Sequence, residues 1–231
     1  GIRDTSVTGV QTCALPILRI LSKLKKIIKN TPICVGNIAT GEAAIKLYNS
    51  GADIIKVGIG PGSICTTRMV AGIGVPQISA IKEVKKALNK KNIKIISDGG
   101  IKFSGDIAKA IAAGADAIMM GSIFAGTDES PGKKFKIKGK IYKQYRGMGS
   151  IGAMSSGSAN RYFQKKFKDK SKFVPEGVEG RVEYKGNVSK IIYQLQGGLR
   201  SSMGYIGAKN LNQLKKNAKF IKITKIGRAH V

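Results

Sequence analysis

Short apolar runs alternate with stretches of helical spacing between residues 18 and 120. Residues 18–30 carry apolar side chains on one face and lysines on the other: Leu18, Leu21, Leu24 and Ile28. This spacing predicts an amphipathic helix. Further helices are predicted from about Thr40 to Tyr48, over 77–90 and over 104–113, and short buried strands at 32–36, 53–57, 94–97 and 116–120. Short buried strands joined by helices predict parallel βαβ units.

A weak internal repeat supports this alternation. SGADIIKVGIG at 50–60 and AGADAIMMGS at 113–122 both contain a helix end, a Gly-Ala-Asp turn, an apolar strand and a glycine. Glycines at strand ends are typical of a (β/α) barrel, whose active site lies at that face. A doubly wound dinucleotide-binding sheet is the alternative, but GIGPG at 58–62 lacks the expected acidic residue downstream. We therefore predict an α/β fold of the (β/α)8 TIM-barrel class.

Residues 127–186 differ in character from the preceding segment. KFKIKGKIYKQYR at 134–146 alternates like a β-hairpin, with Gly139 near its turn. From 147 to 186 we expect a long loop, a functional lid or a disordered segment. Helical spacing returns over 187–205, and 210–223 is predicted to form a short helix and a terminal strand.

Composition excludes several classes of protein. The chain has 231 residues, of which 42% are hydrophobic, which is a globular composition. No run of 18 apolar residues predicts a membrane span, and the N-terminus has no signal-peptide pattern. Three cysteines do not make a disulfide framework, and no Cys/His cluster has zinc spacing. These features favour the cytoplasm.

The formal net charge is +28. Such a charge indicates either an anionic partner such as nucleic acid or a lysine-rich coding bias. The lysines are scattered rather than gathered in one stripe, and aromatic residues make up only 6% of the chain. Coding bias is the favoured interpretation, and a basic nucleic-acid-binding module is kept as the alternative from a different class.

The two ends of the chain resemble foreign sequence. VTGVQTCALPI at 7–17 and IGRAHV at 226–231 back-translate to a common short-read sequencing adapter in opposite orientations. Residues 1–17 and 226–231 are therefore expected to be non-native, which leaves 18–225 as the native segment. Cys13 and His230 are discarded as catalytic candidates on this ground.

One stretch concentrates the candidate chemistry. GIGPGSICTTR at 58–68 presents Cys65 in a glycine-rich turn, where a cysteine is a candidate nucleophile. A buried inert thiol is the alternative. Ser63, Gly100, Gly121 and Ser122 follow strand ends and could bind one phosphate, although ordinary turns would also use them. Asp98 could accept hydrogen bonds from ribose hydroxyls, or cap a helix.

Six motifs together resemble one family. GPGSICTTR, SDGGIKFSGD (97–106), MMGS (119–122), YRGMGS (145–150), NRYF (160–163) and PEGVEG (175–180) occur in the order of the catalytic barrel of inosine-5′-monophosphate (IMP) dehydrogenase. The resemblance covers nearly all of 31–224. It implies the C-terminal half of a TIM barrel with an active-site flap at about 127–186.

The resemblance also implies an activity in guanine nucleotide biosynthesis. Members of the family oxidise IMP to xanthosine monophosphate (XMP) with NAD, through a covalent thioimidate on the cysteine. The catalytic positions would be Cys65, Thr67, Arg161 and Tyr162. The substrate positions would be Ser63, Asp98, Gly99, Gly100, Gly121, Ser122, Tyr145, Arg146, Gly147, Met148, Gly149, Glu176 and Gly177. Arg161 would act as the unusual base for water.

Two cofactors are implied in the same way. Gly58, Ile59 and Gly60 would contact NAD, and the backbone carbonyls of Gly60, Gly62 and Cys65 would ligate potassium. The parent protein would be a homotetramer. The acidic residue for the NAD ribose, the first half of the barrel and the CBS module have no counterpart in this sequence. We therefore expect the polypeptide as written to be inactive and poorly soluble.

The nearest rival is guanosine monophosphate (GMP) reductase, which shares the barrel and the cysteine loop. That enzyme needs no hydrolysis and lacks the Arg-Tyr flap. NRYF at 160–163 and RGMGS at 146–150 favour the dehydrogenase.

Overall fold

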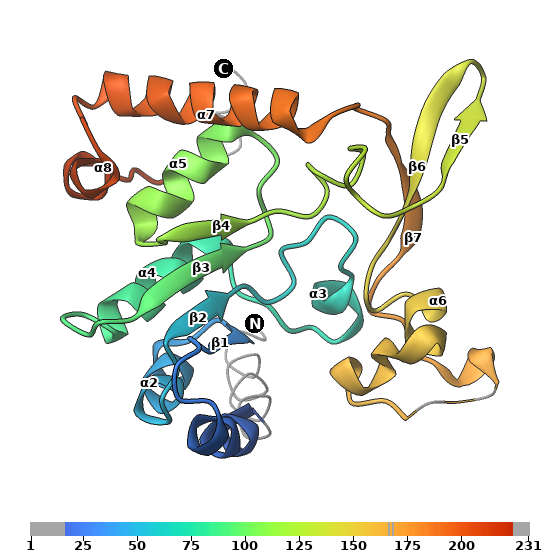
Figure 1. Cartoon of the computed structure of the whole chain (residues 1–231), viewed down its shortest axis with the longest axis horizontal. Coiled ribbons are helices and arrows are strands. Elements are labelled where there is room, and N and C mark those ends of the chain that lie inside the picture. Colours follow the sequence, from blue (N-terminus) through green and yellow to red (C-terminus); the bar gives the residue numbers. More distant parts are fainter. Residues whose placement is uncertain (1–16, 166, 168, 224–231) are drawn as a thin grey trace.

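The first structural unit is a sheet of four parallel strands. The computed structural model describes residues 17–165, 167 and 169–223. The strands lie side by side in chain order: β1 (Cys34–Ile38), β2 (Ile54–Val57), β3 (Lys94–Asp98) and β4 (Ala117–Met119). The helices that connect them are α2 (Gly41–Asn49), α3 (Thr67–Val70), α4 (Gln77–Ala87) and α5 (Ser104–Ala113). Strands that neighbour one another in chain order form the arc of a barrel (Figure 1), so the predicted partial TIM-barrel fold is confirmed.

The main core lies between this sheet and its helices. Ile55 and Val57 on β2 and Ile95 on β3 are buried against apolar residues of α4, such as Ile81 and Val84. The helix predicted at 18–30 is present at residues 17–27. The four predicted strands and the helices predicted near 40–48 and 77–90 are present with shifted ends, and the helix predicted at 104–113 is present with the same bounds.

The aspartate of the internal repeat has a structural role. Asp53 Oδ2 accepts from the Ile33 N–H at 2.7 Å and from Lys25 Nζ at 2.6 Å. Asp116 makes the equivalent contacts two strands later, before β4, with the Ile95 N–H at 2.9 Å and Lys215 Nζ at 2.7 Å. Each carboxylate thus joins the start of its own strand to the start of the preceding strand and to a lysine of an outer helix. The repeat in the sequence therefore corresponds to a repeat of this set of hydrogen bonds.

We expect Asp116→Asn to lower the free energy of unfolding by about 1–2 kcal/mol at pH 7, because a charged acceptor is lost. Burial raises the pKa of Asp116, but the hydrogen bonds from Lys215 and Ile95 outweigh it and hold the pKa below its ordinary value. This contribution is present above pH ~4 and is lost as the pH falls through the lowered pKa. Denaturant unfolding across pH 2–7 checks it. The exposed Asp169→Asn is the control, and an equal loss in both variants would contradict the role.

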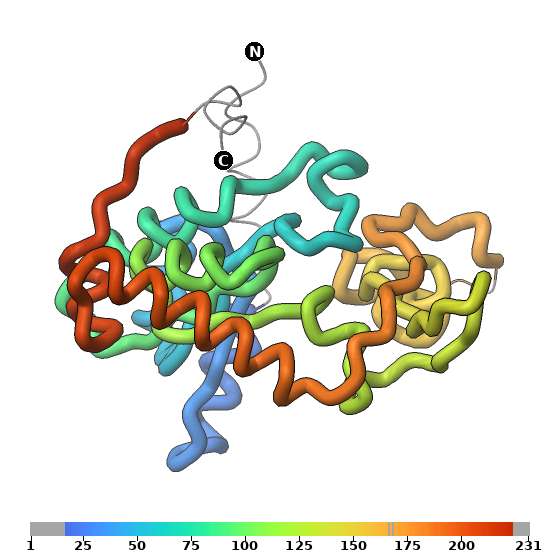
Figure 2. Tube along the Cα trace, turned by 90° about the horizontal axis from the view of Figure 1, so that it is seen from above, coloured from blue at the N-terminus to red at the C-terminus, as the bar shows by residue number. Residues whose placement is uncertain are grey.

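The C-terminal half adds a small antiparallel sheet beside the main body. β5 (Lys134–Ile137) and β6 (Lys140–Arg146) form the predicted hairpin, and β7 (Glu179–Glu183) pairs with β6. Lys138 and Gly139 both have positive φ, as a two-residue type I′ turn requires. Figures 1 and 2 both show this segment to one side of the parallel sheet.

The prediction of a long loop over 147–186 is wrong. The segment contains α6 (Ile151–Ala153), a π-helical turn at Met154–Ser158, two 3-10 turns (Ala159–Tyr162 and Lys170–Lys172) and β7. Met154, Ala159 and Phe173 form a second small core. The sequence pattern does not predict these elements, because each is too short for an apolar residue to recur and the segment is rich in glycine and serine.

A long helix returns the chain to the main body. α7 (Val188–Tyr205) begins at Asn187, whose side chain accepts from the Ser189 N–H, and packs against α5. Its apolar stripe faces the core: Ile191, Leu195, Leu199 and Met203. A Cβ on Gly198 would come within 2.1 Å of Ser104 Oγ, so this crossing requires glycine.

The end of the described chain differs from expectation. α8 (Leu211–Asn217) is present, but residues 218–223 form no strand, so the predicted terminal strand is wrong within the described range. Phe220 instead packs under the Lys82 ammonium. The adapter-like segments lie outside the described residues, apart from Ile17 in the first helix. No helix in the described part of the chain is long and apolar enough to cross a membrane.

Candidate functional site

The cysteine loop follows β2 and is held in a turn. The Cys65 N–H donates to the Gly62 carbonyl at 3.2 Å, and the Cys65 thiol donates to Thr67 Oγ1 at 3.2 Å. Thr67 is the first residue of α3, so the short helix places this hydroxyl beside the sulfur. Cys65 is partly exposed. The thiol is therefore not buried, as the alternative interpretation required, and its role as a nucleophile stays a prediction.

Two glycine-rich segments fix the loop from the flap side. The Thr66 N–H donates to the Glu176 carbonyl at 2.9 Å, and the Val178 N–H donates to the Ile64 carbonyl at 3.0 Å. The Glu176 N–H in turn donates to the Gly149 carbonyl at 3.0 Å. The motifs GPGSICTTR, YRGMGS and PEGVEG, far apart in sequence, thus form one hydrogen-bonded unit.

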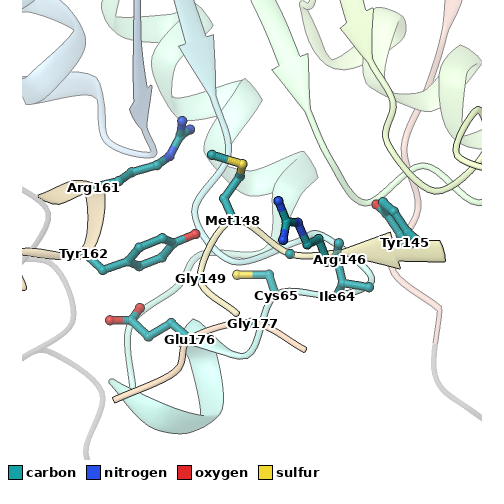
Figure 3. Close-up of a pocket in the computed structure, with 11 residues that line it drawn as sticks. Ile64, Cys65, Tyr145, Arg146, Met148, Gly149, Arg161, Tyr162, Glu176 and Gly177 are labelled. Carbon is teal, nitrogen blue, oxygen red and sulfur yellow. The ribbon is translucent and has the colours of Figure 1, made fainter. Parts of the chain in front are cut away.

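A first cavity of about 280 Å³ opens beside the thiol. Its lining contains most of the residues predicted to surround a purine base, together with the flap pair: Ile64, Cys65, Tyr145, Arg146, Gly147, Met148, Gly149, Arg161, Tyr162, Glu176 and Gly177. Figure 3 shows the thiol of Cys65 between Tyr162 on one side and Tyr145 with Arg146 on the other. The Tyr162 hydroxyl points into this space, whereas the guanidinium of Arg161 lies at its rim.

A second cavity of about 160 Å³ adjoins the first and shares Tyr145 with it. It lies at the C-terminal ends of the strands and is lined by the residues predicted for phosphate and ribose, by Tyr145, which was predicted to lie near the base, and by five further residues. The lining is Pro61, Gly62, Ser63, Asp98, Gly99, Gly100, Ile101, Lys102, Met120, Gly121, Ser122 and Tyr145. Within the described residues, the N–H groups of Gly100, Gly121 and Ser122 donate to no protein acceptor. Unpartnered N–H groups at a turn suit an anion.

Asp98 ends β3 and belongs to a polar cluster that the sequence analysis missed. Its Oδ2 accepts from Lys56 Nζ at 2.9 Å and from Asn37 Nδ2 at 2.9 Å. Its Oδ1 has no partner among the described residues, so one carboxylate oxygen is available to a ligand. The helix-cap alternative for Asp98 is wrong, because α5 begins after Phe103.

Two signals in the sequence point to the missed residues. Lys56 interrupts the otherwise apolar run DIIKV, and Asn37 follows the strand run PICVG as a polar residue at a strand end. Lys102 lines the second cavity directly after the glycine turn at 99–101. Burial of a charged residue inside an apolar strand costs free energy unless the charge is paired. Lys56 in DIIKV therefore indicates an acidic partner nearby.

The two tyrosines of the site remain protonated at neutral pH. Burial raises the pKa of Tyr145, while its hydrogen bond with Ser63 opposes the shift. Burial also raises the pKa of Tyr162, and the nearby Cys65 and Glu176 add to this effect while Arg161 opposes it. Both hydroxyls can therefore act as hydrogen-bond donors.

The positions predicted for NAD do not line either of these two cavities. A Cβ on Gly58 would lie 2.1 Å from the Asp98 carbonyl, and one on Gly60 would lie 2.7 Å from Arg68 Cγ. Close packing therefore explains these two glycines. The Arg68 guanidinium donates to the carbonyls of Val75 at 2.6 Å and Ile59 at 3.3 Å, which fixes the turn.

The carbonyls predicted for potassium lie within the same turn. The Gly62 carbonyl already accepts from the Cys65 N–H. No group of three or more His, Cys, Asp or Glu side chains suited to a metal ion occurs among the described residues. Any cation at this turn would therefore be held by neutral backbone oxygens.

The parallel βαβ units form the arc of a barrel, and two adjoining cavities lie at its strand ends, one of them beside a cysteine. This arrangement defines a (β/α)-barrel protein with a nucleotide-sized site. Comparison with known proteins identifies the family. The model of the IMP dehydrogenase / GMP reductase domain matches residues 7–230. The chain belongs to this family.

Individual relatives agree with the family match. The chain is 58% identical over 219 residues to inosine-5′-monophosphate dehydrogenase of Methanocaldococcus jannaschii, covering 91% of this chain and 44% of that protein. It is 55% identical over 214 residues to inosine-5′-monophosphate dehydrogenase of Cryptosporidium parvum, covering 93% and 53%. The enzyme of the same name from Chlorobaculum parvum is 55% identical over 245 residues, covering 98% and 50%. The chain spans about half the length of the curated relatives it matches.

Proposed function

We propose that this chain forms the substrate-binding and catalytic part of an enzyme that oxidises IMP to XMP with NAD, in guanine nucleotide biosynthesis. One observation carries the proposal. A partly exposed cysteine lines a cavity that also contains an Arg-Tyr flap, and this cavity shares Tyr145 with a second cavity that has unpartnered N–H groups and a free carboxylate oxygen. Curated relatives named inosine-5′-monophosphate dehydrogenase support it.

The second cavity would hold the phosphate and ribose. The N–H groups of Gly100, Gly121 and Ser122 would bind phosphate oxygens, with the hydroxyls of Ser63 and Tyr145. Asp98 Oδ1 would accept from a ribose hydroxyl, because Lys56 and Asn37 already hold Oδ2. The base would then extend past Tyr145 into the first cavity, where the Glu176 carboxylate would accept from its N1–H.

The covalent step begins at the sulfur of Cys65. The thiol gives up its proton to solvent water, the sulfur bonds to C2 of the purine, and C2 loses its hydrogen as a hydride. NAD, when bound, supplies the acceptor for that hydride. Thr67 Oγ1 lies 3.2 Å from the sulfur, where it can orient the thiol and later the attacking water.

Hydrolysis would release the product. Water adds to C2 of the thioimidate, loses a proton to a base, and the C–S bond breaks to give XMP and the free thiol. Arg161 is the proposed base, and it lies on the flap beside Tyr162 at the first cavity. Tyr162, which stays protonated, would donate a hydrogen bond to the water.

The finer partners stay predictions. The backbone at Gly58, Ile59 and Gly60 would contact NAD, and the carbonyls of Gly60, Gly62 and Cys65 would hold potassium, a hard-oxygen set that suits such an ion. The homotetramer and the cytoplasmic location rest on the family resemblance and on composition.

Two other functions are less well supported. GMP reductase is not favoured, because the relatives described above are named IMP dehydrogenases and the flap pair Arg161 and Tyr162 lines the cavity. The nucleic-acid-binding alternative has no specific observation in its favour.

Because the chain spans about half the length of its relatives and is expected to be inactive alone, the proposal is tested with the chain completed to their full length, purified and incubated with IMP and NAD. We expect NADH absorbance that depends on IMP, and, after rapid quenching, an adduct on the Cys65 peptide that weighs two hydrogens less than the sum of IMP and thiol. Omission of NAD should prevent the adduct, because the hydride then has no acceptor. The absence of both signals would contradict the proposed function.

A further inference from the structure

Lys143 on β6 is buried, and the one acidic side chain whose charge is seen to interact with it among the described residues, Asp128, makes no ion pair with it. It is 2% exposed and is the only buried Lys, Arg, Asp or Glu among the residues that the structure describes. Its Nζ donates to the Thr127 carbonyl at 2.6 Å and to the Ser130 carbonyl. None of the ion pairs in the described part of the chain includes it. Burial of an ammonium carries a desolvation penalty, so overall stability alone gives no reason for a lysine here.

The two carbonyls belong to the loop that joins the sides of the second cavity. β4 ends at Met119, and the loop continues from the turn at Gly121 and Ser122 into the hairpin β5–β6. It is also held at its far side, where the Asp128 N–H donates to the Gly186 carbonyl at 2.9 Å. The ammonium of Lys143 therefore attaches the middle of the loop to β6, the second strand of the hairpin.

The same strand carries Tyr145 into the substrate site. Residues two apart on a strand face the same side, so Lys143 and Tyr145 both face the loop. Tyr145 lines both cavities. A Cβ on Gly121 would lie 2.8 Å from the Tyr145 hydroxyl oxygen, so this hydroxyl lies directly beside the turn at Gly121. The register of β6 against the loop thus sets the position of this hydroxyl relative to the turn at Gly121.

We propose that Lys143 is a positioning residue for the nucleotide phosphate. Its ammonium holds the loop 124–131 in place, and the loop in turn keeps Tyr145 beside the turn at Gly121 and Ser122. A methionine of similar length would fill the space but would leave the carbonyls of Thr127 and Ser130 without a donor. The loop would then move to hydrate those carbonyls, and Tyr145 would lose its place beside Gly121. The choice of IMP as ligand rests on the proposed function.

Lys143→Met tests this proposal, with Lys134→Met as the matched control. Lys134 lies directly opposite Lys143 in the hairpin register, but its side chain is about half exposed and pairs with Asp128. Calorimetric titration with IMP should show at least about tenfold weaker binding for Lys143→Met and little change for Lys134→Met. In Lys143→Ala, propylammonium should restore part of the affinity, whereas tetramethylammonium, which has no N–H donor, should not.

A second measurement works without IMP. The titration of Tyr145, observed by 13C NMR as the signal missing from Tyr145→Phe, should move toward the ordinary tyrosine pKa of about 10 in Lys143→Met. Unchanged IMP affinity with an unchanged Tyr145 titration would overturn the positioning role. So would a loss of affinity equal to that of Lys134→Met. A wild-type protein that fails to bind IMP would contradict the proposed function, and the Tyr145 titration would still decide the role of Lys143.

Discussion

Replacement of Cys65 by alanine in the chain completed to full length should abolish IMP-dependent NADH formation while leaving IMP binding nearly unchanged. The thiol is the only nucleophilic sulfur at the two cavities in the described residues, and it forms the bond to C2 in the proposed reaction. Loss of a covalent nucleophile typically lowers kcat by about 10³-fold or more. The phosphate and ribose contacts lie in the second cavity and do not involve the sulfur, so affinity should be retained. Steady-state kinetics and calorimetric titration with IMP measure the two effects separately.

Cys34 offers a matched control for this experiment. It is a free cysteine on β1 that is exposed and lines neither cavity. Cys34→Ala should therefore turn over IMP at nearly the wild-type rate and still form the adduct on Cys65. Equal loss in both variants, or full turnover by Cys65→Ala, would contradict the assignment of the nucleophile.

The parts of the fold that the sequence predicts are those decided by local pattern. The strands containing Ile55 and Ile95 bury alternate residues against the helices and consist mostly of apolar residues, and the helices between them show clear 3.6-residue periodicity. The hairpin was predictable because Gly139 marks its turn. The grouping of Ser63, Asp98 and Gly121 followed from topology, since the ends of parallel strands meet at one edge of a sheet.

The parts that the sequence did not predict depend on contacts between distant segments. β7 forms only because β6 offers it a partner edge, and its five residues are too few to show alternation. The pairing of Asp98 with Lys56 and Asn37 joins three strands, so no single window of sequence contains it. Lys143 looks like the other lysines of a basic hairpin, and only its burial distinguishes it.

The glycines of the site illustrate the same division. The motifs YRGMGS and PEGVEG could be read as flexible, but the structure shows that a glycine of each packs tightly against backbone. A Cβ on Gly147 would lie 3.0 Å from the Ile64 carbonyl, and one on Gly177 would lie 3.2 Å from the backbone of Gly149. The cysteine loop is therefore positioned by backbone packed against backbone, which leaves little freedom for Cys65 to move.

Gly149→Ala should lower kcat/KM by about tenfold or more. The new methyl group would lie 2.8 Å from Cζ of Tyr162 and 2.9 Å from the carbonyl carbon of Glu176. The ring of Tyr162 cannot stay in place, and the backbone of Glu176 has to shift as well, although it holds Thr66 through a hydrogen bond. Overpacking of this kind typically costs about 1–3 kcal/mol. Because the displaced groups are the flap tyrosine and the support of the cysteine loop, most of that cost should fall on the reaction.

Gly180→Ala is the matched control for this substitution. Gly180 lies on β7, four residues from Glu176, and a Cβ there would meet no atom within 4 Å. This variant should keep wild-type kinetics and thermal stability. If the flap matters mainly for hydrolysis, Gly149→Ala should also accumulate the Cys65 adduct under turnover, because the thioimidate forms but water is poorly placed to release it. A Gly149→Ala protein with wild-type kcat/KM and no extra adduct would show that Tyr162 need not rest on Gly149 during the reaction.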